Sequence, residues 1–197
     1  DVAPSRGLGD VYKRQKYNTR MFSTRIATQI YAKICFETTL GQKKIIEKLS
    51  EYLAGDDFSR IFVLNGYAGT GKTTLIAALV GALKDLNIKP ILLAPTGRAA
   101  KVLAQYAQEK AFTIHKRIYR QRTNADYESK YSLNFNAEKG AVFIVDEASM
   151  LSDSPGGGAL FGSGSLLEDL VQYVRSGRDC RLVLVGDSAQ LPPVGAD

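Results

Sequence analysis

Residues 61–74 read IFVLNGYAGTGKTT, an apolar run followed by a glycine-rich loop and then by the first residues of a helical pattern. Gly66–Thr73 match G-x-x-x-x-G-K-[ST] in full, with the flanks that such a phosphate-binding loop requires. The glycines let backbone N–H groups turn toward an anion, and the start of a helix adds its positive end. The stretch therefore predicts a P-loop between a buried strand and a helix.

This loop predicts where a nucleotide binds. Lys72 can reach the β- and γ-phosphates, and the hydroxyl of Thr73 can bind Mg²⁺. ATP and Mg²⁺ are the cofactors we expect. The predicted nucleotide contacts in this segment are Gly66, Ala68, Gly69, Thr70, Gly71, Lys72, Thr73 and Thr74.

Strands and helices alternate along the rest of the chain. Apolar runs predict buried strands at residues 60–64, 91–94, 141–145 and 181–185. Helical spacing predicts helices at 24–35, 42–54, 72–86, 98–109 and 165–175. Apolar runs without alternation are typical of parallel strands covered on both faces, so we expect an α/β fold with a mostly parallel sheet. Residues 121–140 are polar and favour a surface hairpin, and the Ser- and Gly-rich residues 152–165 favour a loop.

Composition narrows the class of protein. The chain has 197 residues, enough for one domain with a core. No apolar run approaches the roughly 20 residues needed to span a bilayer, so we expect no membrane partner. Cys35 and Cys180 lie far apart and favour free thiols in a reducing compartment. A cytoplasmic, bacterial protein fits these features.

The net charge of +6 is concentrated near the N-terminus. Residues 1–34 hold seven Lys/Arg and two acids, whereas the rest of the chain is almost neutral. Residues 1–20 show no hydrophobic period and are interpreted as a non-native or disordered leader, with a basic targeting leader as the alternative. The expected organisation is this leader, a helical segment at 21–55, and a P-loop ATPase domain at 56–197.

An acidic pair follows the run Ala141–Val145. Asp146 stands where a carboxylate can hold Mg²⁺ through water beside a phosphate-binding loop. Glu147 can then orient or deprotonate the attacking water. A solvated acidic turn is the alternative. Lys72, Asp146 and Glu147 are thus the predicted catalytic residues, and Thr73 and Asp146 the predicted Mg²⁺ ligands.

Four motifs together resemble those of RecD-like DNA helicases of superfamily 1, in that family's order. They are Ala94–Ala100 (APTGRAA), Thr113–His115 (TIH), Asp146–Met150 (DEASM) and Gly186–Gly195 (GDSAQLPPVG). The resemblance covers residues 36–195. It implies a RecA-like three-layer sandwich that couples ATP hydrolysis to movement on single-stranded DNA.

The resemblance also implies roles for single residues. Gln42 would read the adenine edge, and Gln190 would sense the γ-phosphate as a fourth catalytic residue. Thr96 would contact a DNA phosphate, although it could equally be a plain helix N-cap. The residues expected near DNA are Pro95, Thr96, Gly97, Arg98, His115, Lys116 and Arg117.

The residues themselves give a weaker DNA signal. Residues 110–122 carry five Lys/Arg and no acid, with Phe112, His115 and Tyr119 interleaved. Basic and aromatic side chains together suit a groove for single strands, and a solvated helix face is the alternative. His115 is expected to be structural or to lie next to DNA.

The family's second RecA-like half is not found in these 197 residues, and neither is the arginine that it brings to the ATP site. Such an arginine is worth about 10³–10⁵ in rate in related P-loop enzymes. We therefore expect a sheet that is incomplete at the C-terminus and a fragment that binds Mg-ATP but hydrolyses it slowly. The alternative function is a P-loop module that acts on proteins rather than DNA.

Overall fold

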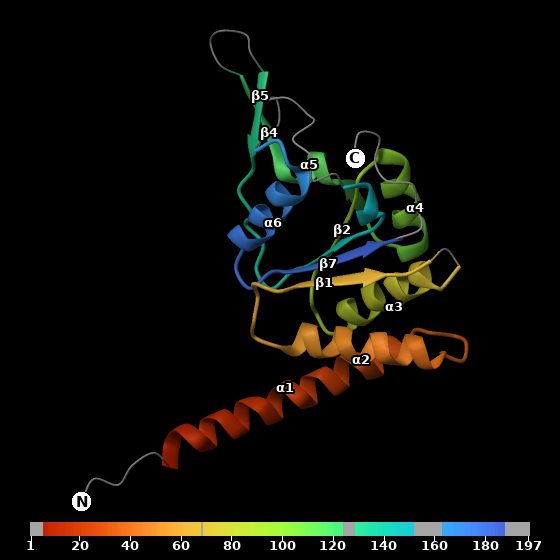
Figure 1. Ribbon diagram of the computed structural model, residues 1–197, viewed down its shortest axis with the longest axis vertical. Helices are drawn as coiled ribbons and strands as arrows, with labels where there is room; N and C mark the ends of the chain where they lie inside the picture. The colour runs from red at the N-terminus through yellow and green to blue at the C-terminus, as the bar shows by residue number, and fades with distance from the viewer. Residues whose placement is uncertain (1–5, 68, 124–128, 152–162, 188–197) are drawn as a thin grey trace, which may run out of the picture. The chain divides into compact units, whose positions relative to one another are not determined.

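The computed structural model describes residues 6–67, 69–123, 129–151 and 163–187. The chain divides into two compact units, Asp1–Asp57 and Phe58–Asp197 (Figure 1). Within the described residues, no helix combines the length and the apolar character needed to cross a bilayer.

The first unit contains two helices, α1 (Arg6–Ala32) and α2 (Leu40–Ala54). Thr39 and Gln42 form a reciprocal capping box that begins α2, and Gly55 ends it as the sequence predicts. Helix α1 differs from the prediction, because it begins at residue 6 rather than near residue 24. Once a helix is nucleated, each added residue gains one hydrogen bond, and no proline lies between residues 6 and 32.

The second unit is built on a parallel sheet that, within the described residues, has five strands (Figure 1). The order across the sheet is β1-β7-β6-β2-β3, and every neighbouring pair is parallel. This confirms the predicted α/β fold. The strands are β1 (Ile61–Asn65), β2 (Pro90–Ala94), β3 (Ala111–Thr113), β6 (Val142–Val145) and β7 (Arg181–Gly186).

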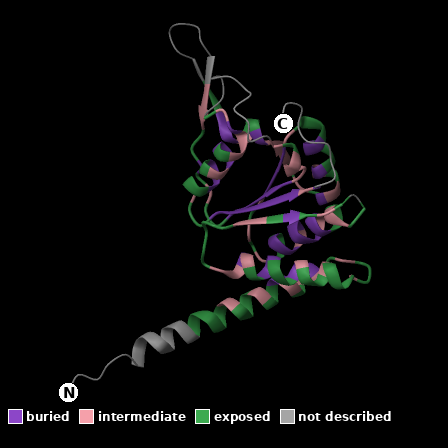
Figure 2. Ribbon diagram, in the orientation of Figure 1, coloured by how far each residue is buried: buried purple, intermediate pink, exposed green. Residues whose placement is uncertain are grey.

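Helices cover both faces of this sheet, which gives the three layers expected. Helices α3 (Lys72–Asp85) and α4 (Gly97–Ala107) lie on one face, and α5 (Ile114–Ile118) and α6 (Leu166–Ser176) on the other (Figure 1). Alternate residues of each strand point to opposite faces. Phe143 and Leu182 join Ile118 and Tyr173 in the core beneath α5 and α6. Figure 2 shows how completely the inner strands are buried.

Several elements differ from the sequence prediction. Strand β3 and helix α5 were not expected, because each is too short to show a period of its own. The predicted hairpin is present as the antiparallel pair β4 (Tyr119–Thr123) and β5 (Ser129–Leu133), and it begins two residues early. A short 3₁₀ turn, η1 (Ala148–Met150), follows the acidic pair. Most of the loop predicted at 152–165 lies outside the described residues.

Candidate nucleotide-binding site

The parallel topology gathers the predicted site residues at one edge of the sheet. The segments that follow β1, β7, β6 and β2 all leave from the carboxyl ends of their strands, where α/β proteins bind ligands. The phosphate-binding loop follows β1, Asp187 follows β7, Asp146-Glu147 follow β6, and Pro95–Arg98 follow β2.

Two glycines give the phosphate-binding loop its shape. Gly69 and Gly71 adopt φ angles of 78° and 84°, in the left-handed region that glycine reaches without strain. Gly71 is the N-cap of α3, and within the described residues no side chain caps this helix start. Backbone N–H groups at such a start suit an anion. The loop is tied to the neighbouring strand because the N–H of Gly66 donates to the carbonyl of Gly186 at 3.3 Å.

Lys72 connects this loop to the segment after β7. Its amine donates to the carbonyl oxygens of Gly66 and Tyr67, the latter at 2.7 Å. It also lies 3.6 Å from Oδ2 of Asp187, whose side chain is 6% exposed. The N–H of Asp187 in turn donates to Oγ of Ser149 at 3.5 Å. Lys72, Asp187 and Ser149 thus bridge the loop after β1 and the turn after β6.

Asp187 is a site residue that the sequence prediction missed. The sequence predicts a role for Gln190 of the same motif, but none for Asp187. The sequence does contain a signal for Asp187, because this aspartate directly follows a buried strand. A carboxylate in such a position needs a charged partner.

The acidic pair is held by backbone and side-chain hydrogen bonds. The N–H of Asp146 donates to the carbonyl of Leu93 on β2 at 3.0 Å. Its Oδ1 accepts the N–H of Glu147 at 2.9 Å, and its Oδ2 accepts the hydroxyl of Tyr106 on α4. Tyr106 is not among the site residues that the sequence predicts.

The surroundings of Glu147 and Tyr106 raise the pKa values of these two side chains. Burial and the charge of Asp146 raise the pKa of Glu147, and Arg98 partly opposes this. A carboxylate with a raised pKa is a stronger base once ionised. Burial and the bond to Asp146 also raise the pKa of Tyr106, so its hydroxyl keeps the proton that it donates.

A small cavity joins the acidic pair to the start of α4. It has a volume of about 130 Å³ and is lined by Thr96, Arg98, Ala99, Val102, Asp146 and Glu147. Helical spacing places Val102 on the apolar face of α4, but it is 51% exposed and lines this cavity instead. Oγ1 of Thr96 accepts the N–H of Ala99 at 3.1 Å, so the N-cap interpretation of Thr96 is confirmed.

Residues 115–117, which are also expected near DNA, follow β3 at the same edge of the sheet. Thr113 of β3 is the register partner of Ala94 of β2, so α5 and α4 begin after neighbouring strands. Lys116 is exposed there. Desolvation lowers the pKa of His115, which favours its neutral form at neutral pH.

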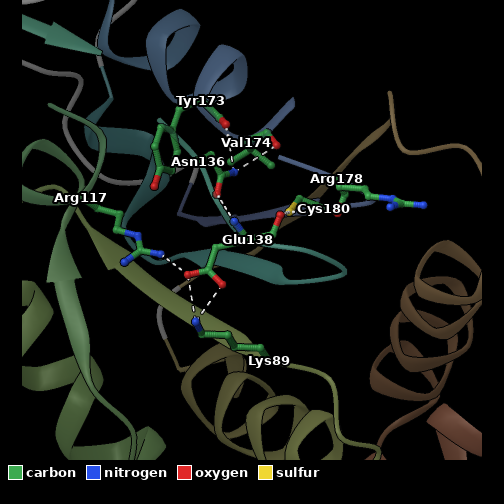
Figure 3. Close-up of polar contacts among 8 residues, drawn as sticks. All are labelled: Lys89, Arg117, Asn136, Glu138, Tyr173, Val174, Arg178 and Cys180. Atoms are coloured by element: carbon green, nitrogen blue, oxygen red, sulfur yellow. Dashed lines mark hydrogen bonds and ion pairs between the residues drawn. The ribbon is translucent and has the colours of Figure 1, made fainter. Parts of the chain in front are cut away.

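Arg117 differs from its neighbours on α5. Its guanidinium pairs with Glu138 at 2.5 Å, and Lys89 pairs with the same carboxylate at 2.8 Å (Figure 3). Two aromatic side chains of the segment, Phe112 and Tyr119, also point inward. Phe112 packs against the core, and the buried Tyr119 donates to Asp169 at 2.6 Å. Lys116 is therefore better placed for a ligand than Arg117 or these aromatics.

The donor set at this edge fits a divalent metal held jointly with phosphate. Within the described part of the chain, no group of three or more His, Cys, Asp and Glu side chains could hold a metal by itself. Mg²⁺ typically takes one or two carboxylates together with phosphate oxygens and water. The protein's ligands to the metal would be Asp146 and Thr73, which lies in the first turn of α3.

The roles of three more residues, Ala68, Gln190 and Gln42, also stay predictions. Ala68 and Gln190 lie outside the described residues. Gln42 belongs to the first unit, where its Oε1 accepts the N–H of Thr39 at 3.0 Å. Its contact with adenine stays a prediction.

Comparison with known proteins identifies the family. Residues 39–197 match the AAA domain family. The chain is 34% identical to the ATP-dependent RecD2 DNA helicase of Deinococcus radiodurans, over 70% of this chain and 17% of that protein. It is 32% identical to the RecBCD enzyme subunit RecD of Mycobacterium tuberculosis, over 69% of this chain and 25% of that one.

A phage protein gives a similar result. The ATP-dependent DNA helicase dda of Enterobacteria phage T4 is 32% identical, over 66% of this chain and 28% of its own. The chain thus spans between about a sixth and somewhat over a quarter of these relatives. By the match over most of its length, the chain belongs to the AAA domain family, whose P-loop members bind a nucleotide with a divalent metal.

Proposed function

We propose that this chain is the ATP-binding motor domain of a RecD-like, ATP-dependent DNA helicase. Its similarity to three proteins described as DNA helicases or as the RecD subunit of RecBCD supports this proposal. In the whole protein, ATP hydrolysis would drive movement along single-stranded DNA. A second RecA-like lobe would complete the ATP site.

The residues at the sheet edge divide the chemistry between them. Gly66–Thr73 would wrap the phosphates of ATP, and Lys72 would exchange its carbonyl partners for phosphate oxygens. Thr73 and Asp146 would hold Mg²⁺, which neutralises charge on the transferring phosphoryl group. Glu147 would orient the attacking water and accept its proton. Gln190 would respond to the γ-phosphate.

One observation supports a coupling between DNA binding and ATP hydrolysis. Thr96 and Arg98, which resemble DNA-contact residues, line the same cavity as Asp146 and Glu147. A strand bound at the start of α4 would therefore lie beside the groups that hydrolyse ATP. A DNA contact at that position can change the surroundings of Glu147 directly, through Arg98.

Binding of a fluorescent oligothymidylate at several salt concentrations tests this proposal. We expect binding that weakens as salt rises, because each neutralised phosphate of a single strand contributes about −0.7 to the logarithmic salt slope. Arg98→Ala should weaken binding and make that slope shallower by about 0.7.

Lys101→Ala provides the matched control, since Lys101 is an exposed cation of the same helix outside the cavity. It should leave the slope close to that of the unchanged chain. Binding that ignores salt, or equal effects of the two substitutions, would contradict a DNA contact at this cavity.

A further inference from the structure

Asp146 has both carboxylate oxygens engaged by this chain. Oδ1 accepts the N–H of Glu147 at 2.9 Å, and Oδ2 accepts the hydroxyl of Tyr106. The first bond is local, since it joins consecutive residues. The second comes from 40 residues earlier in the chain, on a different element. Tyr106 is therefore the side chain that ties the orientation of this carboxylate to α4.

The position of Tyr106 follows from the spacing along α4. Residues three and four apart lie on the same face of a helix, so Ala99, Val102 and Tyr106 form one stripe. Ala99 and Val102 line the cavity that contains Asp146 and Glu147. The stripe thus continues from the cavity to the hydroxyl that reaches Asp146.

We propose that Tyr106 is a positioning residue that holds the carboxylate of Asp146 in the orientation that receives the divalent metal. This inference rests on the proposed function of the site. An ionised carboxylate oxygen offers about two acceptor positions, so Oδ2 can accept the phenol and still face a metal-bound water. A phenol donating to a carboxylate forms a charge-assisted bond, roughly twice as strong as a neutral one.

A second tyrosine–aspartate pair in the chain provides a control. It separates a positioning role of Tyr106 at the metal site from a purely structural role. Tyr119 donates to Oδ2 of Asp169 at 2.6 Å, and Asp169 is 1% exposed. Tyr119 begins β4 and Asp169 lies on α6. Replacing each tyrosine with phenylalanine removes the same kind of bond, at the candidate metal site in one variant and away from it in the other.

The experiment measures metal affinity directly. Mn²⁺, a spectroscopic substitute for Mg²⁺, is titrated into the chain with a non-hydrolysable ATP analogue, and bound metal is followed by electron paramagnetic resonance. Tyr106→Phe should weaken metal affinity about tenfold, since loss of a group that orients a ligand typically costs 10–100-fold. Analogue binding in EDTA should stay unchanged, which also reports an intact fold. Tyr119→Phe should leave both affinities unchanged.

Two results would overturn the role of Tyr106. One is an unchanged metal affinity in Tyr106→Phe. The other is an equal loss in Tyr119→Phe, which would assign the effect to general destabilisation. A failure of the unchanged chain to bind the analogue at all would instead contradict the proposed function.

Discussion

Glu147 has a backbone conformation that non-glycine residues seldom adopt. Its φ of 54° lies in the left-handed region, and holding a side chain there costs about 1–3 kcal/mol. The bond from its N–H to Oδ1 of Asp146 helps to maintain this conformation. The turn places both carboxylates on the wall of one cavity. Strain of this kind concentrates at functional sites, which supports a catalytic role for the pair.

Glu147→Gln tests that role. The amide keeps the size of the side chain but cannot accept a proton, so ATP binding should remain close to that of the unchanged chain. Hydrolysis should fall by about 10²–10⁴, the usual contribution of a general base. Single-turnover hydrolysis of radiolabelled ATP, together with the binding of a fluorescent ATP analogue, measures the two effects separately.

Glu168→Gln is the corresponding control, because Glu168 is an exposed acid on α6. Its hydrolysis rate should match that of the unchanged chain. If Glu147→Gln also hydrolyses ATP at that rate, another group must act as the base.

At the residue scale, the sequence predicts contacts that are local and misses those that are not. Lys72 and Thr73 follow from the loop motif, and Asp146 and Glu147 from their place after a buried strand. The bonds from Tyr106 to Asp146 and from Lys72 to Asp187 join segments far apart in the chain. Such contacts depend on strand order and on the face that a helix presents, which local patterns do not contain.

At the scale of elements, Glu138 joins three of them at a partly buried ion-pair cluster. Its carboxylate pairs with Lys89, which directly precedes β2, and with Arg117 of α5, and Glu138 itself leads toward β6 (Figure 3). Burial alone would raise the pKa of Glu138, but the bonds to Lys89 and Arg117 outweigh it and lower that pKa. The cluster therefore stabilises the packing of α5 on the sheet.

Glu138→Gln should lower the free energy of unfolding by about 1–3 kcal/mol at pH 7, the cost of losing hydrogen bonds to charged groups. A lowered pKa in the folded state stabilises it above the ordinary glutamate pKa of about 4.3. That stability is lost as the pH falls through the lowered value. The difference between variant and unchanged chain should therefore shrink below about pH 4, as urea unfolding at several pH values can measure.

Glu109→Gln tests whether burial matters for this effect. Glu109 also pairs with a lysine, Lys84 at 2.7 Å, but the Glu109 side chain is 28% exposed, against 17% for Glu138. Surface pairs contribute about 0–1 kcal/mol, so this variant should change stability little. Equal losses in the two glutamine variants would contradict the stabilising role of the Glu138 cluster.

The elements themselves could be predicted where their patterns were long enough. Helix α3 has buried residues at all five positions that its period indicates, Leu75, Ile76, Leu79, Val80 and Leu83. Strand β3 has three residues, and α5 has five, too few for a period to appear. The basic and aromatic residues at 110–122 favour a surface that binds single strands. In the structure, Phe112 and Tyr119 pack against the core instead.

At the scale of the whole molecule, the described nucleotide-contact and catalytic residues of the sheet edge all belong to the second unit. The P-loop, the acidic pair and Asp187 lie between Phe58 and Asp197. The relatives are several times longer than this chain. Nucleotide binding is thus the activity that we expect this unit to show by itself, and we propose that an arginine from a second lobe would speed the hydrolysis.

Mg-ATP should therefore stabilise the chain against heat. A ligand present at 100 times its Kd adds about 2.7 kcal/mol to the free energy of unfolding, or about 5–10 °C in Tm for a unit of this size. Lys72→Ala should remove most of this shift, because Lys72 is the cation that the loop motif assigns to the phosphates. Lys84→Ala removes a lysine from the other end of α3, where it pairs with Glu109, and should keep the shift. Differential scanning fluorimetry with and without Mg-ATP compares the three proteins, and a full shift in Lys72→Ala would mean that ATP binds elsewhere on the chain.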